Sequence, residues 1–305
     1  MKNLDKCLKE LKILLPELEL RRDEPMKNHC SFRIGGPVAA MAFPKSREEA
    51  ETLAQTLASA DIEPFVMGNG TNLLVSDKPL DMFVIKTCDG LSNIEDLGDG
   101  RIFAESGVTL ARLAVFAKEH GLSGLEFAHG IPGSLGGAVS MNAGAYGGEM
   151  KDVVESTVFL DSDMELFEIS GDEHEFSYRS SVFSDTDTVI LGSVLRLGRG
   201  EPTEIAAKMK ELMEKRRASQ PLDMPSAGST FKRPVGGYAA ALIDQAGLKG
   251  FGIGGAKVSE KHAGFVVNGG GATFDDVIAL MEHIRETVYK NSGIELEPEV
   301  KIIDM

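Results

Sequence analysis

The sequence predicts an α+β fold in two parts, residues 1–200 and residues 201–305. With 305 residues, of which 42% are hydrophobic, the chain is long enough for two domains of ordinary size with buried cores. Short apolar segments typical of strands are interspersed with amphipathic segments typical of helices in both parts. Two glycine-rich segments both lie before residue 150, so the first part is expected to hold a ligand.

Hydrophobic periodicity and capping residues place the individual elements. In the first part, helices are expected over Leu4–Leu15, Ser46–Ala60 and Leu110–His120, and strands over Val38–Phe43, Phe65–Met67, Met82–Thr87, Arg101–Glu105 and Val189–Leu197, with a hairpin over Val153–Ile169 that bends at Asp161–Asp163. In the second part, helices are expected over Thr203–Ala218 and Tyr238–Ala246, and from Thr273, with Asp276 completing its cap, to Gly293; strands are expected over Gly264–Asn268 and Glu295–Ile303. The closing strand is free to return to the first part.

The longer glycine-rich segment, Gly130–Gly148, reads GIPGSLGGAVSMNAGAYGG. Glycine is favoured where φ is positive or where the backbone approaches another group closely, and exposed N–H groups in such a segment can bind an anion. A tight structural loop or a flexible linker is the alternative. Apolar Ile131, Leu135, Val139 and Met141 would anchor the segment, which argues against a linker and favours a ligand-binding loop.

The shorter segment follows a predicted strand and reads Gly68-Asn69-Gly70-Thr71-Asn72. It lacks the Lys-Ser/Thr of a P-loop, and the chain has no complete GxGxxG after a strand. These absences argue against a nucleoside triphosphatase and against a Rossmann dehydrogenase.

Taken together, GNGTNLLVSD and GIPGSLGGAVSMNAGAYG resemble the two-part FAD-binding signature of the UDP-N-acetylenolpyruvoylglucosamine reductases, the MurB family of bacterial cell-wall synthesis. The resemblance continues in order through SYRSSVF, AGSTFKRP, GGAKVSEKHAGFVVN and LEPEVKII, and so covers nearly the whole chain. It implies a two-part FAD-binding domain of the PCMH/vanillyl-alcohol-oxidase type, followed by a smaller α+β substrate domain.

The resemblance implies that FAD is held noncovalently and that NADPH is the co-substrate. Arg33, between aromatic and glycine residues, either pairs with a cofactor phosphate or forms a local ion pair. The residues expected to bind FAD are Arg33, Gly68, Asn69, Gly70, Thr71, Asn72, Gly130, Ile131, Pro132, Gly133, Ser134, Gly136, Gly137, Ala138, Asn142, Gly144, Ala145, Tyr146 and Ile190.

Three residues are expected to be catalytic by resemblance alone: Arg179, Ser229 and Glu299. Taken singly, they would be read as a surface arginine, a turn serine and a carboxylate at a strand edge. The family places a fixed guanidinium at Arg179, the proton donor at Ser229, and a glutamate that stabilises or protonates the intermediate at Glu299. Glu297 is the nearest rival of Glu299.

Arg217, Lys232 and Tyr238 are expected to contact the UDP-sugar, with packing or solvent exposure as the equal alternative. No substrate role is transferred to Arg233, where some relatives carry asparagine. About 50 residues separate Arg179 from Ser229, which indicates the shorter, type II form of the family. No histidine or cysteine spacing indicates a metal site.

The formal net charge of −15 disfavours nonspecific binding to nucleic acid or to an anionic membrane. Because FAD, NADPH and a UDP-sugar are all anionic, local basic groups such as Lys215-Arg216-Arg217 must offset this charge. Three scattered cysteines fit a reducing cytoplasm, and neither a signal peptide nor an apolar run of membrane-spanning length is visible. We expect a cytoplasmic monomer that acts on small molecules and binds neither nucleic acid nor membranes.

The resulting prediction is an FAD enzyme that reduces UDP-N-acetylglucosamine enolpyruvate to UDP-N-acetylmuramate with NADPH. Two alternatives stay open at this point. One is an FAD oxidase of the same superfamily that uses oxygen as acceptor. The other is a noncatalytic flavin- or sugar-nucleotide-binding protein, in which the glycine-rich segments serve storage or sensing.

Overall fold

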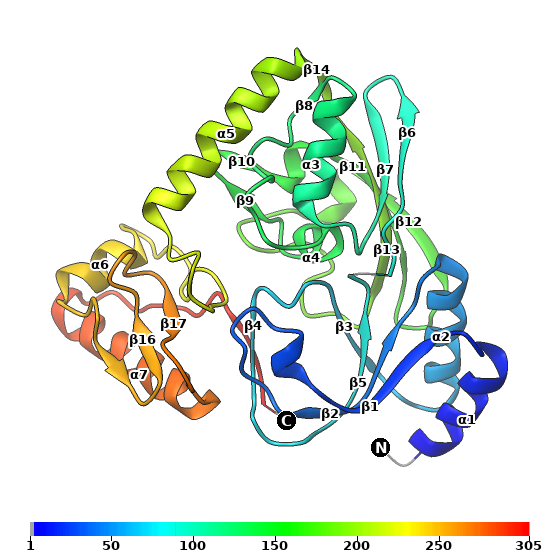
Figure 1. The fold of residues 1–305 in the computed structure, drawn as a ribbon, viewed down its shortest axis with the longest axis horizontal. Coiled ribbons are helices and arrows are strands. Elements are labelled where there is room, and N and C mark those ends of the chain that lie inside the picture. Colours follow the sequence, from blue (N-terminus) through cyan, green and yellow to red (C-terminus); the bar gives the residue numbers. More distant parts are fainter. Residues whose placement is uncertain (1–2, 89, 305) are drawn as a thin grey trace. The chain divides into compact units, whose positions relative to one another are not determined.

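The computed structural model describes residues 3–88 and 90–304 (Figure 1). Packing divides the chain into two compact units, each built from three separate segments. The first unit comprises the residues up to Arg22, Ala40–Asn69 and Met82–Glu214. The second comprises Asp23–Ala39, Gly70–Asp81 and the residues from Lys215 onward. The predicted division at residue 200 assigns FAD to the first part and the substrate to the second part. This assignment of ligands stays a prediction.

Seven α-helices and three 3₁₀ turns occur in the described residues. The helices are α1 (Leu4–Leu14), α2 (Arg47–Ser59), α3 (Leu110–Glu119), α4 (Leu135–Ser140), α5 (Pro202–Ser219), α6 (Ala239–Gln245) and α7 (Phe274–Ser292). The 3₁₀ turns are η1 (Met26–Asn28), η2 (Met150–Asp152) and η3 (Gly171–His174).

The strands of the described residues are mostly short. They are β1 (Glu19–Pro25), β2 (Pro37–Phe43), β3 (Pro64–Met67), β4 (Leu73–Val75), β5 (Leu80–Lys86), β6 (Ile94–Gly98), β7 (Arg101–Glu105), β8 (Leu122–Ser123), β9 (Gly144–Ala145), β10 (Gly148–Glu149), β11 (Val154–Leu160), β12 (Leu166–Ser170), β13 (Val189–Arg196), β14 (Gly198–Arg199), β15 (Gly252–Ile253), β16 (Ala256–Val258), β17 (Val266–Asn268) and β18 (Lys301–Ile303).

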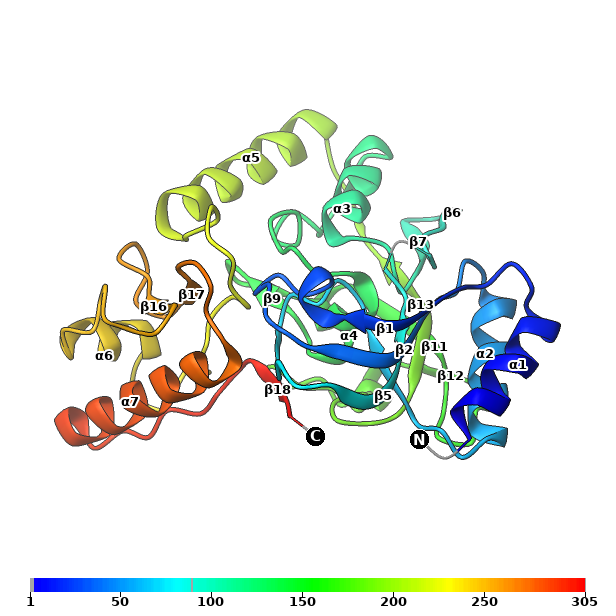
Figure 2. The same ribbon diagram turned by 60° about the horizontal axis from the view of Figure 1, so that its bottom comes forward.

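A five-stranded sheet of order β12-β11-β13-β7-β6 forms the centre of the first unit, and all of its neighbouring strands are antiparallel. The predicted hairpin is confirmed as β11 and β12. Leu113 of α3 and Leu135 and Val139 of α4 are buried in the same core as Leu195 of β13. Helix α1 lies alongside α2 in both ribbon views (Figures 1 and 2). Helix α4, within the longer glycine-rich segment, lies against strands β7 and β13 of this sheet.

The second unit contains the sheet β15-β16-β17, against which α6 and α7 lie. Val277, Leu280 and Ile284 of α7 are fully buried, so the predicted apolar stripe is confirmed. Strand β18 pairs in parallel with β4, and Ile302 lies opposite Leu74. The end of the chain is therefore paired with a segment more than 200 residues earlier.

Capping residues set the helix ends where the sequence indicated. Ser46 accepts a hydrogen bond from the Glu49 amide at 3.2 Å, and α7 begins with a complete capping box. Gly293, in the left-handed region at φ 70°, ends α7. The closing strand is shorter than predicted, because only Lys301–Ile303 forms a regular strand, while Pro298 forms an isolated bridge with Phe231. Proline at 298 has no N–H to donate, which excludes it from a regular strand ladder.

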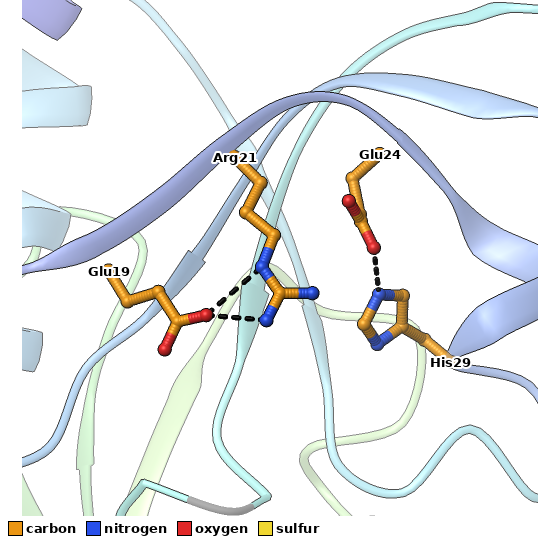
Figure 3. Close-up of polar contacts among 4 residues, drawn as sticks. All are labelled: Glu19, Arg21, Glu24 and His29. Carbon is orange, nitrogen blue, oxygen red and sulfur yellow. Dashed lines mark hydrogen bonds and ion pairs between the residues drawn. The ribbon is translucent and has the colours of Figure 1, made fainter.

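Strand β1 escaped prediction because its sequence, ELRRDEP, is too polar to show alternation. It is the edge strand of a sheet of order β1-β2-β5-β3, and charged residues are common at such edges. Figure 3 shows two polar pairs near it. The Arg21 guanidinium donates to the Glu19 carboxylate at 3.0 Å, and His29 Nε2 lies 2.8 Å from Glu24 Oε1.

None of the helices in residues 3–88 and 90–304 combines the length and apolarity that a membrane span requires.

Candidate active site

The two glycine-rich segments meet in the first unit. The Asn69 side-chain amide donates to the Pro132 carbonyl at 2.6 Å. A Cβ on Gly68 would lie only 2.0 Å from Ser134 Oγ, so only glycine permits this approach. The shorter segment is thereby fixed against the longer one, as a ligand site built from both requires.

Residues 130–148 are more ordered than a loop. The segment contains the short helix α4 and the hairpin of β9 and β10, neither of which the sequence reasoning foresaw. The Leu135 and Gly136 amides donate to the carbonyls of Val108 and Ser106, both at 2.8 Å. Gly136 is needed for this contact, because a Cβ there would lie 2.8 Å from Ser106 Cβ. At Gly137, by contrast, a Cβ would meet nothing within 4 Å.

Two serine hydroxyls beside this segment are buried and have no hydrogen-bond partner among the described residues: Ser106 Oγ and Ser134 Oγ. A buried hydroxyl without a partner is unfavourable and indicates that another molecule supplies one. Bare backbone at Gly137 and these two hydroxyls fit a flat polar cofactor such as FAD. Ser106 was missed in the sequence, although a Ser-Gly pair between a strand and a helix could have indicated it.

The other predicted FAD residues have different surroundings. Asn142 is fully buried; its amide donates to Glu149 Oε2 and to the Ser177 carbonyl, and its side-chain oxygen accepts from the Lys151 amide. Asn142 thus uses both ends of its side chain to hold protein segments together. Ile190 is buried on β13.

In the second unit, Asn72 donates to the Glu299 carbonyl at 3.1 Å. Arg33 is exposed and has a positive φ of 57°. Thr71 is half-buried. The contact of Asn72 links the shorter glycine-rich segment to one of the predicted catalytic residues.

Arg179 lies in the first unit at the tip of a tight reversal. Ser177 and Ser180 pair through both of their backbone groups, which leaves Tyr178 and Arg179 at the turn. Arg179 has a φ of 58°, uncommon for a residue other than glycine, and its guanidinium carbon lies 5.2 Å from the centre of the Tyr178 ring. One guanidinium nitrogen lies 3.4 Å from the Gly144 carbonyl of the glycine-rich segment. The structure therefore brings Arg179 to the predicted FAD segment.

Ser229 and Glu299 come together in the second unit. The Glu299 amide donates to the Thr230 carbonyl at 2.8 Å, and the Lys232 amide donates to the Glu297 carbonyl at 2.9 Å. The strip that begins at Ser229 therefore runs antiparallel to residues 297–299. Two of the three predicted catalytic residues are neighbours across this short ladder.

The same ladder separates Glu299 from its rival. The Glu297 carboxylate forms an ion pair with Lys232 Nζ at 2.5 Å, and its side chain is 70% exposed. Glu299 is half-buried. A carboxylate that is largely exposed to solvent acts less strongly on a bound substrate than one partly withdrawn from solvent, so the difference in exposure favours Glu299.

A turn at Ser259–Gly264 supports the segment that begins at Ser229. The Gly264 carbonyl accepts from the Thr230 amide at 2.8 Å, and the Gly264 amide donates to His262 Nδ1 at 3.2 Å. Partial burial lowers the pKa of His262, which keeps its ring neutral and Nδ1 available as an acceptor. Ser229 is thus attached to a braced backbone.

The predicted substrate residues of the second unit are accessible. Arg217 is exposed, and its carbonyl accepts from Lys261 Nζ at 2.5 Å. The Tyr238 side chain is exposed, and the Arg233 guanidinium carbon lies 4.3 Å from its ring centre. Arg233 therefore does have a local partner, although the sequence assigned it no role.

Comparison with known proteins identifies the family of this chain. The protein-family model of an FAD binding domain matches residues 38–170. The family model of the UDP-N-acetylenolpyruvoylglucosamine reductase C-terminal domain matches residues 220–303. The UDP-N-acetylenolpyruvoylglucosamine reductase of Caldanaerobacter subterraneus subsp. tengcongensis is 51% identical over 96% of this chain and 97% of its own. That of Syntrophomonas wolfei is 46% identical over 95% of this chain and 96% of its own.

A solved structure gives the same result. The crystal structure of UDP-N-acetylenolpyruvylglucosamine reductase (MurB) from Thermus caldophilus is 32% identical in sequence and has a TM-score of 0.79. The match covers 94% of this chain and 99% of that one. The predicted FAD-binding α+β fold is confirmed, and the chain belongs to the UDP-N-acetylenolpyruvoylglucosamine reductase family.

Proposed function

We propose that this chain reduces UDP-N-acetylglucosamine enolpyruvate to UDP-N-acetylmuramate, in peptidoglycan precursor synthesis, with NADPH as the reductant. Relatives with this reductase name match nearly its whole length. Bound FAD supplies the two-electron chemistry that couples NADPH oxidation to reduction of the enolpyruvyl double bond. The protein's own groups bind and orient the reactants, stabilise charge and deliver a proton.

Residues 1–200 hold the cofactor in this proposal, and residues 201–305 bind the sugar nucleotide. The open backbone at Gly137 and the hydroxyls of Ser134 and Ser106 are the groups that would hold the cofactor. The two buried hydroxyls without a partner in the described residues support this placement.

Ser229 is the proposed proton donor to C2 of the enolpyruvyl group. Hydride addition at C3 leaves C2 with enolate character, which makes it a strong base. A hydroxyl with an ordinary pKa can then donate, provided that it lies within hydrogen-bond reach. The antiparallel strip beside residues 297–299 is the observation that carries this assignment, because it holds the backbone of Thr230, next to Ser229, against the backbone of Glu299.

Arg179 and Glu299 are each proposed to stabilise charge during the reaction. A guanidinium has five donors in a fixed plane and remains charged, so it suits a developing enolate or carboxylate oxygen. The reversal that presents Arg179 supports its role, since a defined position costs less orientation entropy during the reaction. Arg217, Lys232 and Tyr238 are the proposed contacts of the UDP-sugar.

The test separates the two half-reactions by stopped-flow absorbance under anaerobic conditions. Ser229→Ala should bind FAD and be reduced by NADPH as the parent is, whereas reoxidation by the enolpyruvyl substrate should slow by at least ~100-fold. Ser226→Ala, three residues earlier in the chain, is the matched control and should lose far less. A Ser229→Ala protein that is reoxidised at the parent rate rules out Ser229 as the donor.

We also propose that the protein works as a monomer in the cytoplasm and binds no nucleic acid. Cys7, Cys30 and Cys88 are all buried, and an odd number of scattered cysteines is usual in proteins of a reducing compartment. The net charge of −15 opposes association with nucleic acid. Light scattering during gel filtration should give a mass near 32.7 kDa, and a mass of twice that value would refute the monomer.

A further inference from the structure

Three buried polar side chains in the first unit are joined by hydrogen bonds, and this network ends at the segment that carries Arg179. His174, Thr157 and Ser193 are each fully buried. His174 Nε2 lies 2.9 Å from Thr157 Oγ1, which lies 2.9 Å from Ser193 Oγ. Thr157 on β11 and Ser193 on β13 lie opposite each other, so this network starts from two neighbouring inner strands of the five-stranded sheet.

The groups at the ends of this hydrogen-bonded network determine which atom carries the proton in each hydrogen bond. His174 Nδ1 lies 3.0 Å from the Gly171 carbonyl, which can only accept, so Nδ1 carries the proton. Burial lowers the pKa of His174, and in the neutral ring Nε2 must then accept. The Thr157 hydroxyl therefore donates to His174, and the Ser193 hydroxyl donates to Thr157. Each of these groups is satisfied in one arrangement only.

His174 is also the base of the arginine loop, which we define as residues 174–182. The Val182 amide donates to the His174 carbonyl at 2.9 Å, and the Ser177–Ser180 pair closes the loop near its tip. The His174 ring stacks on Phe176 at 4.8 Å with an interplanar angle of 6°. Only Tyr178 and Arg179 lie beyond the inner closure. The base of the hairpin that presents Arg179 is thus joined to the sheet by the His174 imidazole, while Asn142 donates to the Ser177 carbonyl nearer the tip.

We propose that His174 is a positioning residue for Arg179: its ring connects the Thr157–Ser193 pair of the sheet to the base of the arginine loop, and so fixes the guanidinium during reduction of the enolpyruvyl substrate. This inference rests on the proposed role of Arg179. It adds a residue that touches neither substrate nor cofactor and acts only through the loop.

Three substitutions test the connection. His174→Phe keeps an aromatic ring beside Phe176 and removes both ring hydrogen bonds. Thr157→Val removes only the hydroxyl that donates to the ring, and Thr157→Ser, the matched control, keeps that hydroxyl. In the holoenzyme, reduction by NADPH should stay within about twofold of the parent for all three. Reoxidation at saturating enolpyruvyl substrate should slow about 10- to 100-fold in His174→Phe and Thr157→Val, the range expected for a misplaced catalytic group, and little in Thr157→Ser.

A double variant asks whether the effect passes through Arg179. In an Arg179→Ala background, His174→Phe should slow reoxidation no further, because the group that it positions is already gone. If the two substitutions slow reoxidation by factors that multiply in the double variant, the inference is overturned. It is also overturned if His174→Phe and Thr157→Val are both reoxidised at the parent rate while Arg179→Ala is slow. Arg179→Ala at the parent rate would instead refute the proposed role of Arg179, and the inference with it.

Hydrogen exchange provides a readout that does not depend on activity. The Val182 amide should exchange faster in His174→Phe and Thr157→Val, while amides of β7 keep the parent rate. Unchanged protection of Val182 in both variants would show that the ring does not hold the loop, and would overturn the inference even if both proteins are less stable.

Discussion

Neighbouring glycines in α4 allow the fold and the cofactor site to be perturbed separately. A Cβ on Gly136 would lie 2.8 Å from Ser106 Cβ, closer than real side chains approach, whereas a Cβ on Gly137 would meet nothing within 4 Å. Both residues lie in the first turn of the same helix. Replacing each with alanine therefore adds the same methyl group to two different environments.

The magnitudes follow from these environments. Alanine is favoured over glycine in a helix by about 1 kcal/mol, and both variants gain this term to a similar degree. Only Gly136→Ala incurs the cost of overpacking, about 1–3 kcal/mol. The difference in unfolding free energy between the two variants should thus be about 1–3 kcal/mol, with Gly137→Ala the more stable. Gly137→Ala should nevertheless bind FAD more weakly, because its methyl group occupies the space proposed for the cofactor.

Urea unfolding of the apoproteins and fluorescence titration with FAD measure the two effects. Gly137→Ala should unfold at a urea concentration no lower than the parent and show a higher Kd for FAD. Gly137→Leu, which keeps good helix propensity, should extend the loss of affinity. If both Gly137 variants bind FAD as the parent does, the cofactor does not lie against this backbone. Equal stabilities of Gly136→Ala and Gly137→Ala would refute the packing argument.

Two further predictions concern the carboxylates and the histidines. Glu299→Gln should slow reoxidation by substrate at least ~10-fold, as loss of an electrostatic group in the site implies, while Glu297→Gln, which loses a solvated ion pair, should change it less than about twofold; the reverse order would favour Glu297. Burial lowers the pKa of His129, His174 and His262 in the folded protein, so the unfolded chain binds more protons below about pH 6.5. The free energy of unfolding should therefore be full above about pH 7 and decrease as the pH is lowered from about 7 to about 5.5; a urea midpoint that rises as the pH is lowered over this range would contradict the assignment.

Local signals were sufficient for the elements that carry them. Thr273 and Asp276 form the capping box that their spacing indicated, and Gly293 ends the same helix. Their success reflects interactions between residues three or four positions apart, which a sequence displays directly. Strand β1 shows the opposite case, because its edge position is set by a neighbouring strand and its own side chains are largely charged.

The site itself was predictable only through resemblance. Nothing near Ser229 in the sequence indicates that Glu299 lies beside it, since 70 residues separate the two and the ladder between them depends on tertiary packing. Thr157, His174 and Ser193 look like ordinary polar residues until the sheet and the 3₁₀ turn bring them together. Such contacts arise from the topology of the fold, and a single sequence taken by itself contains no local signal of them.

An anaerobic titration of the holoenzyme tests the central claim most directly. NADPH in equimolar amount should bleach the flavin absorbance, and UDP-N-acetylglucosamine enolpyruvate should restore it in the absence of oxygen, with UDP-N-acetylmuramate formed in equal amount. Absorbance that returns only when oxygen is admitted would contradict the reductase and indicate an oxidase. A protein that stays colourless after incubation with FAD would contradict the account as a whole.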